Sequence, residues 1–196
     1  MRIGTWNLAG RWDARHLALL EAMDCDVLLL TEVSEHLELP AHDLHLGDAA
    51  MAPHRRWAAV ASRAALRPLP DPHGASAMAE VDGLRVCSSV LPWRTCGSRP
   101  PWTGTSTAER TSAAVAAIES AAPMAGRRSL LEAVARLGLQ VPTATQPHQI
   151  HDLLSIDHIA IPAAWGVADV QRHPAFHDGK RLSDHDAYAV EVQVTG

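Results

Sequence analysis

The sequence predicts a layered α/β fold in which sheets pack face to face and a few helices lie outside them. Apolar runs of strand length recur along the chain, while only a few stretches carry apolar residues at helical spacing. Elements with one apolar face are buried by stacking them in layers. With 196 residues, of which 47% are hydrophobic, the chain can build a substantial core, and we expect one domain over residues 1–196.

The first third of the chain predicts a strand, a helix and a second strand. The strand covers Arg2–Asn7 and ends at its asparagine. The helix covers Asp13–Met23, with the aspartate as a suitable N-cap. The apolar run VLLLTEV over Val27–Val33 is typical of a buried central strand and ends on Glu32. The stretch from Pro40 to Pro53 is rich in His, Asp and Gly, and we expect it to be irregular.

The middle of the chain predicts another strand and then a β-hairpin. Residues Trp57–Ser62 form the strand. The hairpin pairs Ala77–Val81 with Leu84–Val90 around Asp82-Gly83, a dipeptide typical of two-residue hairpin turns. Residues Pro92–Gly104 are expected to form a loop.

Two helices and two strands are predicted for the remainder. The helices cover Thr107–Ala121 and Gly126–Leu137, because Pro123 ends the first and Gly138 is a C-terminal signal for the second. The strands cover Ser155–Pro162 and Ala187–Val194, and we expect a polar loop over Gln171–Ser183.

Composition narrows the classes of function. The formal net charge is -5 and the sequence pI is about 6.1, so the basic footprint of a general nucleic-acid-coating protein is absent. The 3 cysteines form no CxxC pair, and Cys25 is interpreted as a core residue. The N-terminal residues lack the apolar segment of a signal peptide and no run is long enough to span a membrane. We therefore expect a cytoplasmic location.

Polar residues stand at the ends of apolar strands in places that core packing does not explain. They are Asn7, Glu32, Asp157 in SIDHIAIP and the pair Asp184-His185 in LSDHDAYAV. Each has a simpler explanation when taken alone: the asparagine can begin a turn, the glutamate can lie in solvent, and the last segment can be a polar loop.

Taken together, these residues are suited to phosphoester hydrolysis. A hard cation such as Mg²⁺ or Mn²⁺ needs carboxylate or amide oxygens, which Glu32 and Asn7 offer. A histidine facing the phosphorus needs a carboxylate to orient it, and His185 with Asp157 offers this pair. Asp184 can be a further metal ligand or a base.

The motifs TWN, TE after an apolar strand, SIDHI and a final SDH, in this order, resemble those of the endonuclease/exonuclease/phosphatase superfamily, which includes deoxyribonuclease I-like proteins. The resemblance implies a four-layered α/β sandwich of two packed, mostly antiparallel sheets flanked by helices, with the site at their mouth. It matches Glu32 and Asn7 with the metal-site residues and His185 with the catalytic histidine. It also matches Asp184 with the aspartate of SDH, and Asp157 with the aspartate that orients the histidine. The implied partner is a phosphoester substrate, a class that includes nucleic acids.

Two departures from the superfamily pattern limit this expectation. The GDxN motif of a central strand is not found, since only residues 123–125 lie between the two expected helices. We therefore expect one central strand to be lacking, with a gap or distortion in one sheet. The chain would then be a deletion variant, an inactive relative, or a sequence that has lost an internal segment. The second departure is Val90, which stands where the superfamily places a histidine or tyrosine.

The sequence thus predicts a metal-dependent phosphoester hydrolase whose activity is reduced by orders of magnitude if GDxN is truly lost. Arg94 in the loop after Val90 is a weak candidate for binding phosphate. An alternative is an inactive relative that acts as a binding module. A second alternative is metal binding by the histidine-rich segments, although their spacings match no tetrahedral zinc pattern: His36, His42, His45, His54, His148 and His151. Neither the individual substrate nor the oligomeric state can be predicted.

Overall fold

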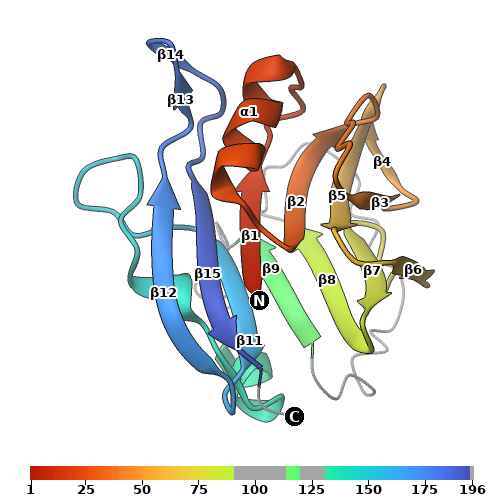
Figure 1. The fold of residues 1–196 in the computed structure, drawn as a ribbon, viewed down its shortest axis with the longest axis vertical. Coiled ribbons are helices and arrows are strands. Elements are labelled where there is room, and N and C mark those ends of the chain that lie inside the picture. Colours follow the sequence, from red (N-terminus) through yellow and green to blue (C-terminus); the bar gives the residue numbers. More distant parts are fainter. Residues whose placement is uncertain (91–113, 120–130, 195–196) are drawn as a thin grey trace.

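The computed structural model of the protein describes residues 1–90, 114–119 and 131–194, the second of these ranges as a backbone strand only. Figure 1 shows two sheets lying one behind the other, with helix α1 (Ala14–Met23) in front of them. The helix that was predicted from Asp13 is confirmed, and the Asp13 side chain caps it by accepting hydrogen bonds from the amides of Arg15 and His16.

The front sheet holds seven of the described strands and both ends of the chain contribute to it. Its order is β12-β15-β1-β2-β5-β3, with β4 also paired to β5. Strands β1 and β2 run parallel, and the other pairs are antiparallel. The strands are β1 (Arg2–Asn7), β2 (Val27–Ser34), β3 (Asp43–Leu46), β4 (Ala50–Ala52), β5 (Arg55–Ser62), β12 (Gly166–His173) and β15 (Ala187–Gln193).

The rear sheet has six described strands in the order β10-β11-β9-β8-β7-β6. Only the β8–β9 pair is parallel. Beside the two sheets, β13 (Phe176–His177) and β14 (Lys180–Arg181) form a small hairpin, and η2 (Pro142–Thr145) is a turn of 3₁₀ helix. The strands are β6 (Leu66–Leu69), β7 (Ser76–Val81), β8 (Leu84–Val90), β9 (Ala114–Glu119), β10 (Leu139–Gln140) and β11 (Asp157–Pro162).

Apolar side chains fill the space between the sheets and the space under α1. Ile3, Leu29 and Val60 of the front sheet meet Val86 and Ile159 of the rear sheet in one buried cluster. Alternate residues of the same front strands point the other way and pack under the helix, because successive strand side chains face opposite sides.

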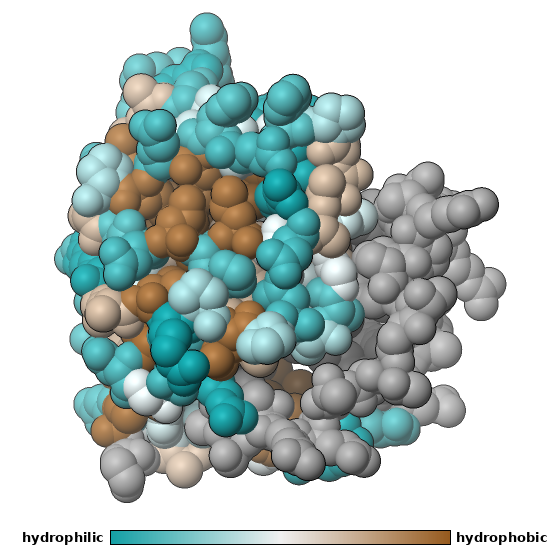
Figure 2. Space-filling model, turned by 90° about the vertical axis from the view of Figure 1, so that its right-hand side faces the viewer, coloured by the Kyte–Doolittle hydropathy of each residue, from teal (hydrophilic) through white to brown (hydrophobic). Residues whose placement is uncertain are grey.

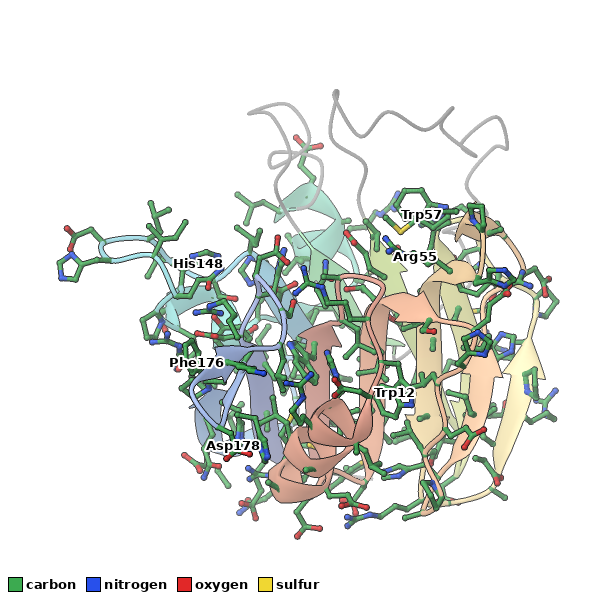
Figure 3. All side chains as sticks on the ribbon, turned by 90° about the horizontal axis from the view of Figure 1, so that it is seen from above. Trp12, Arg55, Trp57, His148, Phe176 and Asp178 are labelled. Atoms are coloured by element: carbon green, nitrogen blue, oxygen red, sulfur yellow. The ribbon has the colours of Figure 1, made fainter. Side chains whose placement is uncertain are left out.

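A helical segment over residues 131–136 completes the predicted four layers. It lies on the far side of the rear sheet from α1 (Figure 3), and it confirms the predicted helix over Gly126–Leu137 as far as the described residues reach. None of the helices in the described ranges is long and apolar enough to cross a membrane.

The predicted hairpin around Asp82-Gly83 is confirmed. The φ angles of Asp82 and Gly83 are 48° and 78°. Two successive residues with positive φ are what a two-residue hairpin turn requires, and the register pairs Val81 with Leu84 directly across it.

The prediction that one central strand is lacking was wrong. Residues of the expected helix Thr107–Ala121 form β9 instead, which pairs with β8 on one side and β11 on the other. Alanine favours helix, but this segment fills a slot between two strands whose backbone groups would otherwise be buried without partners. The described ladder is continuous here, so the expected gap is absent from it.

Two stretches that were expected to be irregular also form strands. Pro40–Pro53 contains β3 and β4, and β12 extends into the expected polar loop Gln171–Ser183, which also contains β13 and β14. Most side chains of β12 are exposed. An edge strand of this kind is held by its backbone ladder and needs little apolar patterning, which is why its sequence did not reveal it.

The opposite edge of the front sheet carries apolar side chains. Figure 2 shows them gathered on this side of the molecule and surrounded by hydrophilic residues. Leu44 and Leu46 of β3 are partly buried there against the cluster under α1. The alternation of leucine with Asp43 and His45 therefore follows the two faces of an edge strand.

Asp186 anchors the segment that leads into β15. Its side chain is fully buried, accepts a hydrogen bond from the Ala175 amide at 2.9 Å, and is bound by the guanidinium groups of Arg172 and Arg181. Burial alone would raise the pKa of Asp186, but the Ala175 amide and Arg172 outweigh it and the pKa is lowered. The carboxylate therefore ties β12 and the β13–β14 hairpin to β15.

Replacing Asp186 with asparagine should lower the free energy of unfolding by about 2 kcal/mol, less than for a wholly buried pair because both arginines are partly solvated. Since the pKa is lowered on folding, this contribution is present above the ordinary aspartate pKa and is lost as the pH falls through the folded value. Urea denaturation at pH 7 and pH 3 measures both effects. Asp82→Asn, at an exposed turn position, is the control, and equal stabilities of the two variants at pH 7 would contradict the prediction.

Candidate active site

The predicted site residues meet at one end of the two sheets. Asn7 and Glu32 stand where the parallel neighbours β1 and β2 end, with Asn7 in register with Thr31. Asp157 is the first residue of β11 in the rear sheet, and His185 lies just before β15 in the front sheet. Because β15 runs antiparallel to β1, its first residues lie beside the end of β1, and the start of β11 brings Asp157 to the same mouth.

His185 and Asp157 form a hydrogen-bonded pair across the two sheets. His185 Nδ1 lies 2.7 Å from Asp157 Oδ2, and the side chains are 11% and 4% exposed. A carboxylate at this distance holds the proton on Nδ1, so Nε2 carries the ring lone pair and can accept a proton. The Ser155 hydroxyl bonds to the backbone of Asp157 on both sides of that residue, which fixes the carboxylate in place.

The SDH segment is held against β1 by hydrogen bonds to its backbone. The Ser183 hydroxyl donates to the Asn7 carbonyl at 2.7 Å and accepts from the His185 amide at 3.1 Å. The indole N–H of the buried Trp6 donates to the His185 carbonyl at 3.0 Å. Ser183 and Trp6 are supporting residues to which sequence reasoning gave no role, although both belong to the motifs SDH and TWN.

Glu32 is held in an unusual backbone conformation. Its φ angle is 47°, in the left-handed region, and its carbonyl accepts a hydrogen bond from the Gly10 amide at 2.7 Å. A non-glycine residue in this region is strained, and such strain is concentrated at functional sites. This local conformation, near the end of β2, places the Glu32 backbone next to the loop that follows Asn7.

The Glu32 carboxylate lies in an acidic, partly desolvated setting. Burial is the main cause that raises its pKa, and the nearby carboxylates of Asp184 and Asp157 raise it further. A hydrogen bond from the Asn7 side chain and the proximity of His185 act in the opposite direction without cancelling the effect. The hydrogen bonds of the site therefore do not fully compensate the negative charge of Glu32.

The donors at this position fit a hard divalent cation. Glu32 offers carboxylate oxygens, and Asn7 Oδ1, which accepts from the Ala9 amide at 2.8 Å, retains a second lone pair. In the described part of the chain, no three His, Cys, Asp or Glu side chains converge as metal ligands. A cation held by one carboxylate and one amide, with water in its other positions, is what Mg²⁺ favours. The exposed Asp184 stays a predicted additional ligand or base.

The other predicted contacts are not part of this arrangement. Arg94 lies outside the described residues. Val90 is fully buried and packs with Trp57 and Ala75, so it takes no polar role.

The histidine-rich segments are separated from one another. His42 bonds to the Cys25 carbonyl, His45 to Asp71, and His36 stacks on His54. Among the residues whose placement is described, they form no metal-binding group.

The end of β9 is a position that sequence reasoning missed. In the two ladders, Glu119 pairs with Asp157 on one side and with Val90 on the other. A further acidic residue therefore occupies the backbone position beside the orienting aspartate. The β-branched Val115 and Ile118 were the available signal for a strand, but the surrounding alanines concealed it.

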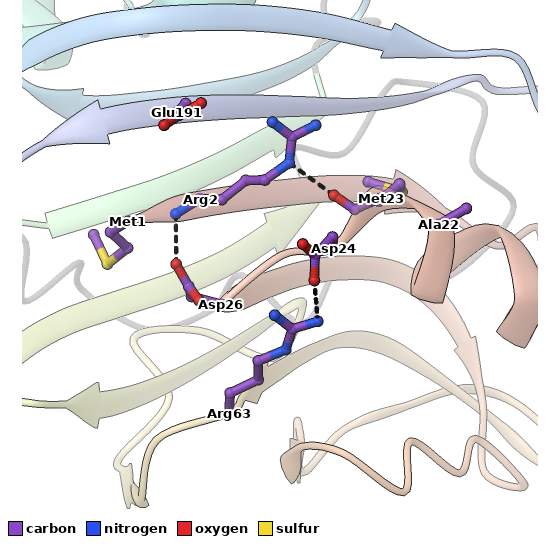
Figure 4. A pocket seen from close by; sticks show the side chains of 8 residues that line it. All are labelled: Met1, Arg2, Ala22, Met23, Asp24, Asp26, Arg63 and Glu191. Carbon is purple, nitrogen blue, oxygen red and sulfur yellow. Dashed lines mark hydrogen bonds and ion pairs between the residues drawn. The ribbon is translucent and has the colours of Figure 1, made fainter.

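A pocket of about 370 Å³ lies at the opposite end of the front sheet (Figure 4). Several of its polar groups bind one another: the Arg2 amide donates to Asp26 at 2.7 Å, and Arg63 pairs with Asp24 at 2.6 Å. The pocket lies away from the strand ends that carry Asn7 and Glu32.

The described residues form a layered α/β sandwich whose mouth carries Glu32, Asp157, Asp184 and His185. No protein-family model and no curated protein sequence matches this chain. Solved structures do match it, with TM-scores such as 0.60 and 0.70, and they confirm the resemblance at the level of the fold.

Three of these structures illustrate the likeness. An AP endonuclease from Archaeoglobus fulgidus has a TM-score of 0.70 and 13% identity, covering 99% of this chain and 100% of its own. The 3' phosphatase NExo from Neisseria, bound to product DNA hairpin, has a TM-score of 0.66 and 18% identity, with coverage of 99% and 100%. The human Nocturnin catalytic domain has a TM-score of 0.64 and 12% identity, with coverage of 100% and 93%.

Glu32→Gln should stabilise the protein at pH 8 in the absence of divalent cations. Because the pKa of Glu32 is raised on folding, its ionised form disfavours the folded state, and this penalty disappears as the pH falls to the ordinary glutamate value of 4.5. We expect the melting temperature at pH 8 to rise by about 2–4 °C, equivalent to roughly 1 kcal/mol in a chain of this size.

The control for this measurement is Glu191→Gln, on an exposed position of β15. It should leave the melting temperature at pH 8 unchanged. A Glu32→Gln protein that is less stable than the wild type at pH 8 in EDTA would show that the carboxylate is not under electrostatic strain.

Proposed function

We propose that the protein is a divalent-metal-dependent phosphoester hydrolase, either nuclease-like or phosphatase-like. The observation that carries this proposal is the His185–Asp157 pair at 2.7 Å, placed at the same strand ends as the oxygen donors Glu32 and Asn7. A phosphoester hydrolase needs an oriented proton-transfer group and a cation site side by side. The fold supports the proposal, because the AP endonuclease and the 3' phosphatase named above share it.

The residues divide the chemistry as follows. Glu32 and Asn7 would hold Mg²⁺ or Mn²⁺, which when bound supplies the positive charge that neutralises the phosphate. His185 Nε2 accepts a proton from the attacking water or, once protonated, donates a hydrogen bond to a phosphoryl oxygen. Asp157 keeps the imidazole in the required tautomer and stabilises its charged form. Asp184, an exposed carboxylate next to His185, would supply a second contact to the cation or to water.

The proposed substrate class is a phosphoester, and nucleic acids belong to it. The Neisseria structure was obtained with product DNA, which supports a nucleic-acid substrate for a protein of this fold. The net charge of -5 favours a short substrate or a strand end over a long polyanion, because binding to duplex DNA depends on neutralising many phosphates.

Hydrolysis of bis-p-nitrophenyl phosphate with Mg²⁺ or Mn²⁺ tests the proposal. Glu32→Gln, His185→Ala and Asp157→Asn should each lower kcat by about a hundredfold or more, because each removes a group that acts on developing charge or positions one that does. Glu191→Gln and His151→Ala, at exposed positions outside the mouth, should retain wild-type rates. Equal rates in all variants would assign the activity to another site or to a contaminant.

An inactive relative that acts as a binding module is the alternative. The observation that favours it is the sequence around the end of β9: residues 117–123 read AIESAAP and contain neither the Asp nor the Asn of the GDxN motif. In the superfamily that this chain resembles, those side chains hold the nucleophilic water and the scissile phosphate. Glu119 is the only acidic residue in that stretch.

Metal-dependent thermal stabilisation separates the two readings of the site. At a Mg²⁺ concentration of about 100 times its Kd, binding should stabilise the wild type by roughly 2.7 kcal/mol and Glu32→Gln by much less. Stabilisation together with turnover supports the hydrolase. Stabilisation without turnover on any phosphoester favours the binding module, and no stabilisation at all would contradict the cation site.

A further inference from the structure

Arg55 stands beside the proposed active site and has no role in it so far. It is the first residue of β5, where its backbone pairs with Ser34 two residues beyond Glu32. Its side chain is exposed, and the view into the end of the sheets in Figure 3 shows it near the mouth. Sequence reasoning overlooked it because its place in the site depends on a turn elsewhere in the chain.

That turn is the one that follows Asn7, and Arg55 lies directly on it. A Cβ atom added at Gly10 would be 2.5 Å from Arg55 Nε and 2.7 Å from Arg55 Cζ. Any larger residue at position 10 would therefore push the guanidinium away. Gly10 itself has a φ of 68° and donates its amide to the Glu32 carbonyl at 2.7 Å. Gly10 is therefore close to the Arg55 side chain and hydrogen-bonded to the backbone of the proposed metal-binding glutamate.

The guanidinium of Arg55 also has no polar partner among the described residues. Within the residues whose placement is described, it has neither an ion pair nor a hydrogen bond. Its neighbour Arg56 differs, since it pairs with Glu35 at 2.8 Å and bonds to the Asp48 carbonyl. An arginine with five donors, seated on a glycine and left without an acceptor, is arranged to receive one from a ligand.

The charge of the site indicates what that ligand is. The mouth holds the carboxylates of Glu32, Asp157 and Asp184, which repel an anionic substrate. A fixed cation on the rim reduces this repulsion, and a planar guanidinium binds phosphate oxygens in pairs with matching geometry. The accessible phosphate of a phosphoester is the anion that this position fits.

We propose that Arg55 is a substrate-binding residue that holds a phosphate group of the substrate on the Glu32 side of the mouth. Gly10, which has no side chain, leaves the space that the Arg55 guanidinium occupies. This inference rests on the proposed function and adds a specificity-determining contact to it. The phosphate can be the scissile one or a neighbouring one in a polynucleotide, and the choice of probe distinguishes these two sources.

Binding is measured without turnover, in the His185→Ala background and with Mg²⁺ present, by isothermal titration calorimetry. The two probes are inorganic phosphate and trithymidylate. Arg55→Ala should weaken binding by about tenfold, and Arg55→Lys by about threefold because it keeps the charge but loses the paired contact. The matched control is Arg67→Ala in the same His185→Ala background. Arg67 lies on the edge strand β6, is 65% exposed and pairs with Glu80, so this variant should bind both probes as tightly as His185→Ala alone.

The probes separate the two sources of phosphate. A loss with both probes assigns Arg55 to the phosphate nearest Glu32 and His185. A loss with trithymidylate alone assigns it to a neighbouring phosphate. Unchanged affinity of Arg55→Ala for both probes, in a protein that melts at the wild-type temperature, would overturn the inference.

Gly10→Ala tests whether the contact between Gly10 and Arg55 positions the guanidinium. It should weaken trithymidylate binding when Arg55 is present and have no further effect in the Arg55→Ala protein, because the strain at a positive φ is common to both backgrounds and cancels in the cycle. Equal losses in both backgrounds would refute the contact between the two residues.

The inference and the proposed function can fail separately. Arg55-dependent phosphate binding by a protein that hydrolyses no phosphoester would refute the hydrolase and keep the subsite. Turnover that depends on Glu32 and His185 but is unaffected in both KM and kcat by Arg55→Ala would do the reverse.

Discussion

The arrangement of the site depends on one hydroxyl group. Ser183 donates to the carbonyl of Asn7, at the end of the first strand, and accepts from the amide of His185, just before the last one. It therefore joins segments that are 176 residues apart in the sequence. Without this bridge, pairing of β1 with β15, the Trp6 indole and Asp157 would still hold His185 near the site, but the direct link between the end of β1 and the His185 backbone amide would be lost.

The metal donors and the proton-transfer pair owe their proximity to strand direction. Asn7 and Glu32 are at the ends of parallel neighbours, whereas Asp157 and His185 are at the beginnings of strands that run the opposite way. The directions of the strands in the two sheets are therefore enough to bring these four side chains to one place. The result is an acidic mouth with Arg55 on its rim.

The buried strands and the central polar residues could be predicted from the sequence, because the physical signal is local. VLLLTEV has a strand's length and a costly carboxylate at its end, and Asp82-Gly83 specifies its own turn. β9 and β12 could not be predicted in the same way. The alanines of β9 favour helix until the two neighbouring strands leave a slot for a third, and β12 is an edge strand with mostly exposed side chains. The same limit applies to Arg55, whose position follows from Gly10 and not from its own neighbours in sequence.

The His185–Asp157 hydrogen bond joins the segment that leads into β15 of the front sheet to β11 of the rear sheet. The distance between its two atoms therefore depends on the spacing between the sheets. That spacing is set by the side chains between them, several of which are small, such as Ala58 and Ala77. A methyl or two added at these positions would separate the layers slightly, and a close-packed interior transmits such a displacement. A hydrogen bond weakens within a few tenths of an ångström, while a fold of this size tolerates the same change. Drift in the protein interior would thus impair the chemistry well before it threatened folding, and selection for function would conserve core volume more strictly than stability alone requires.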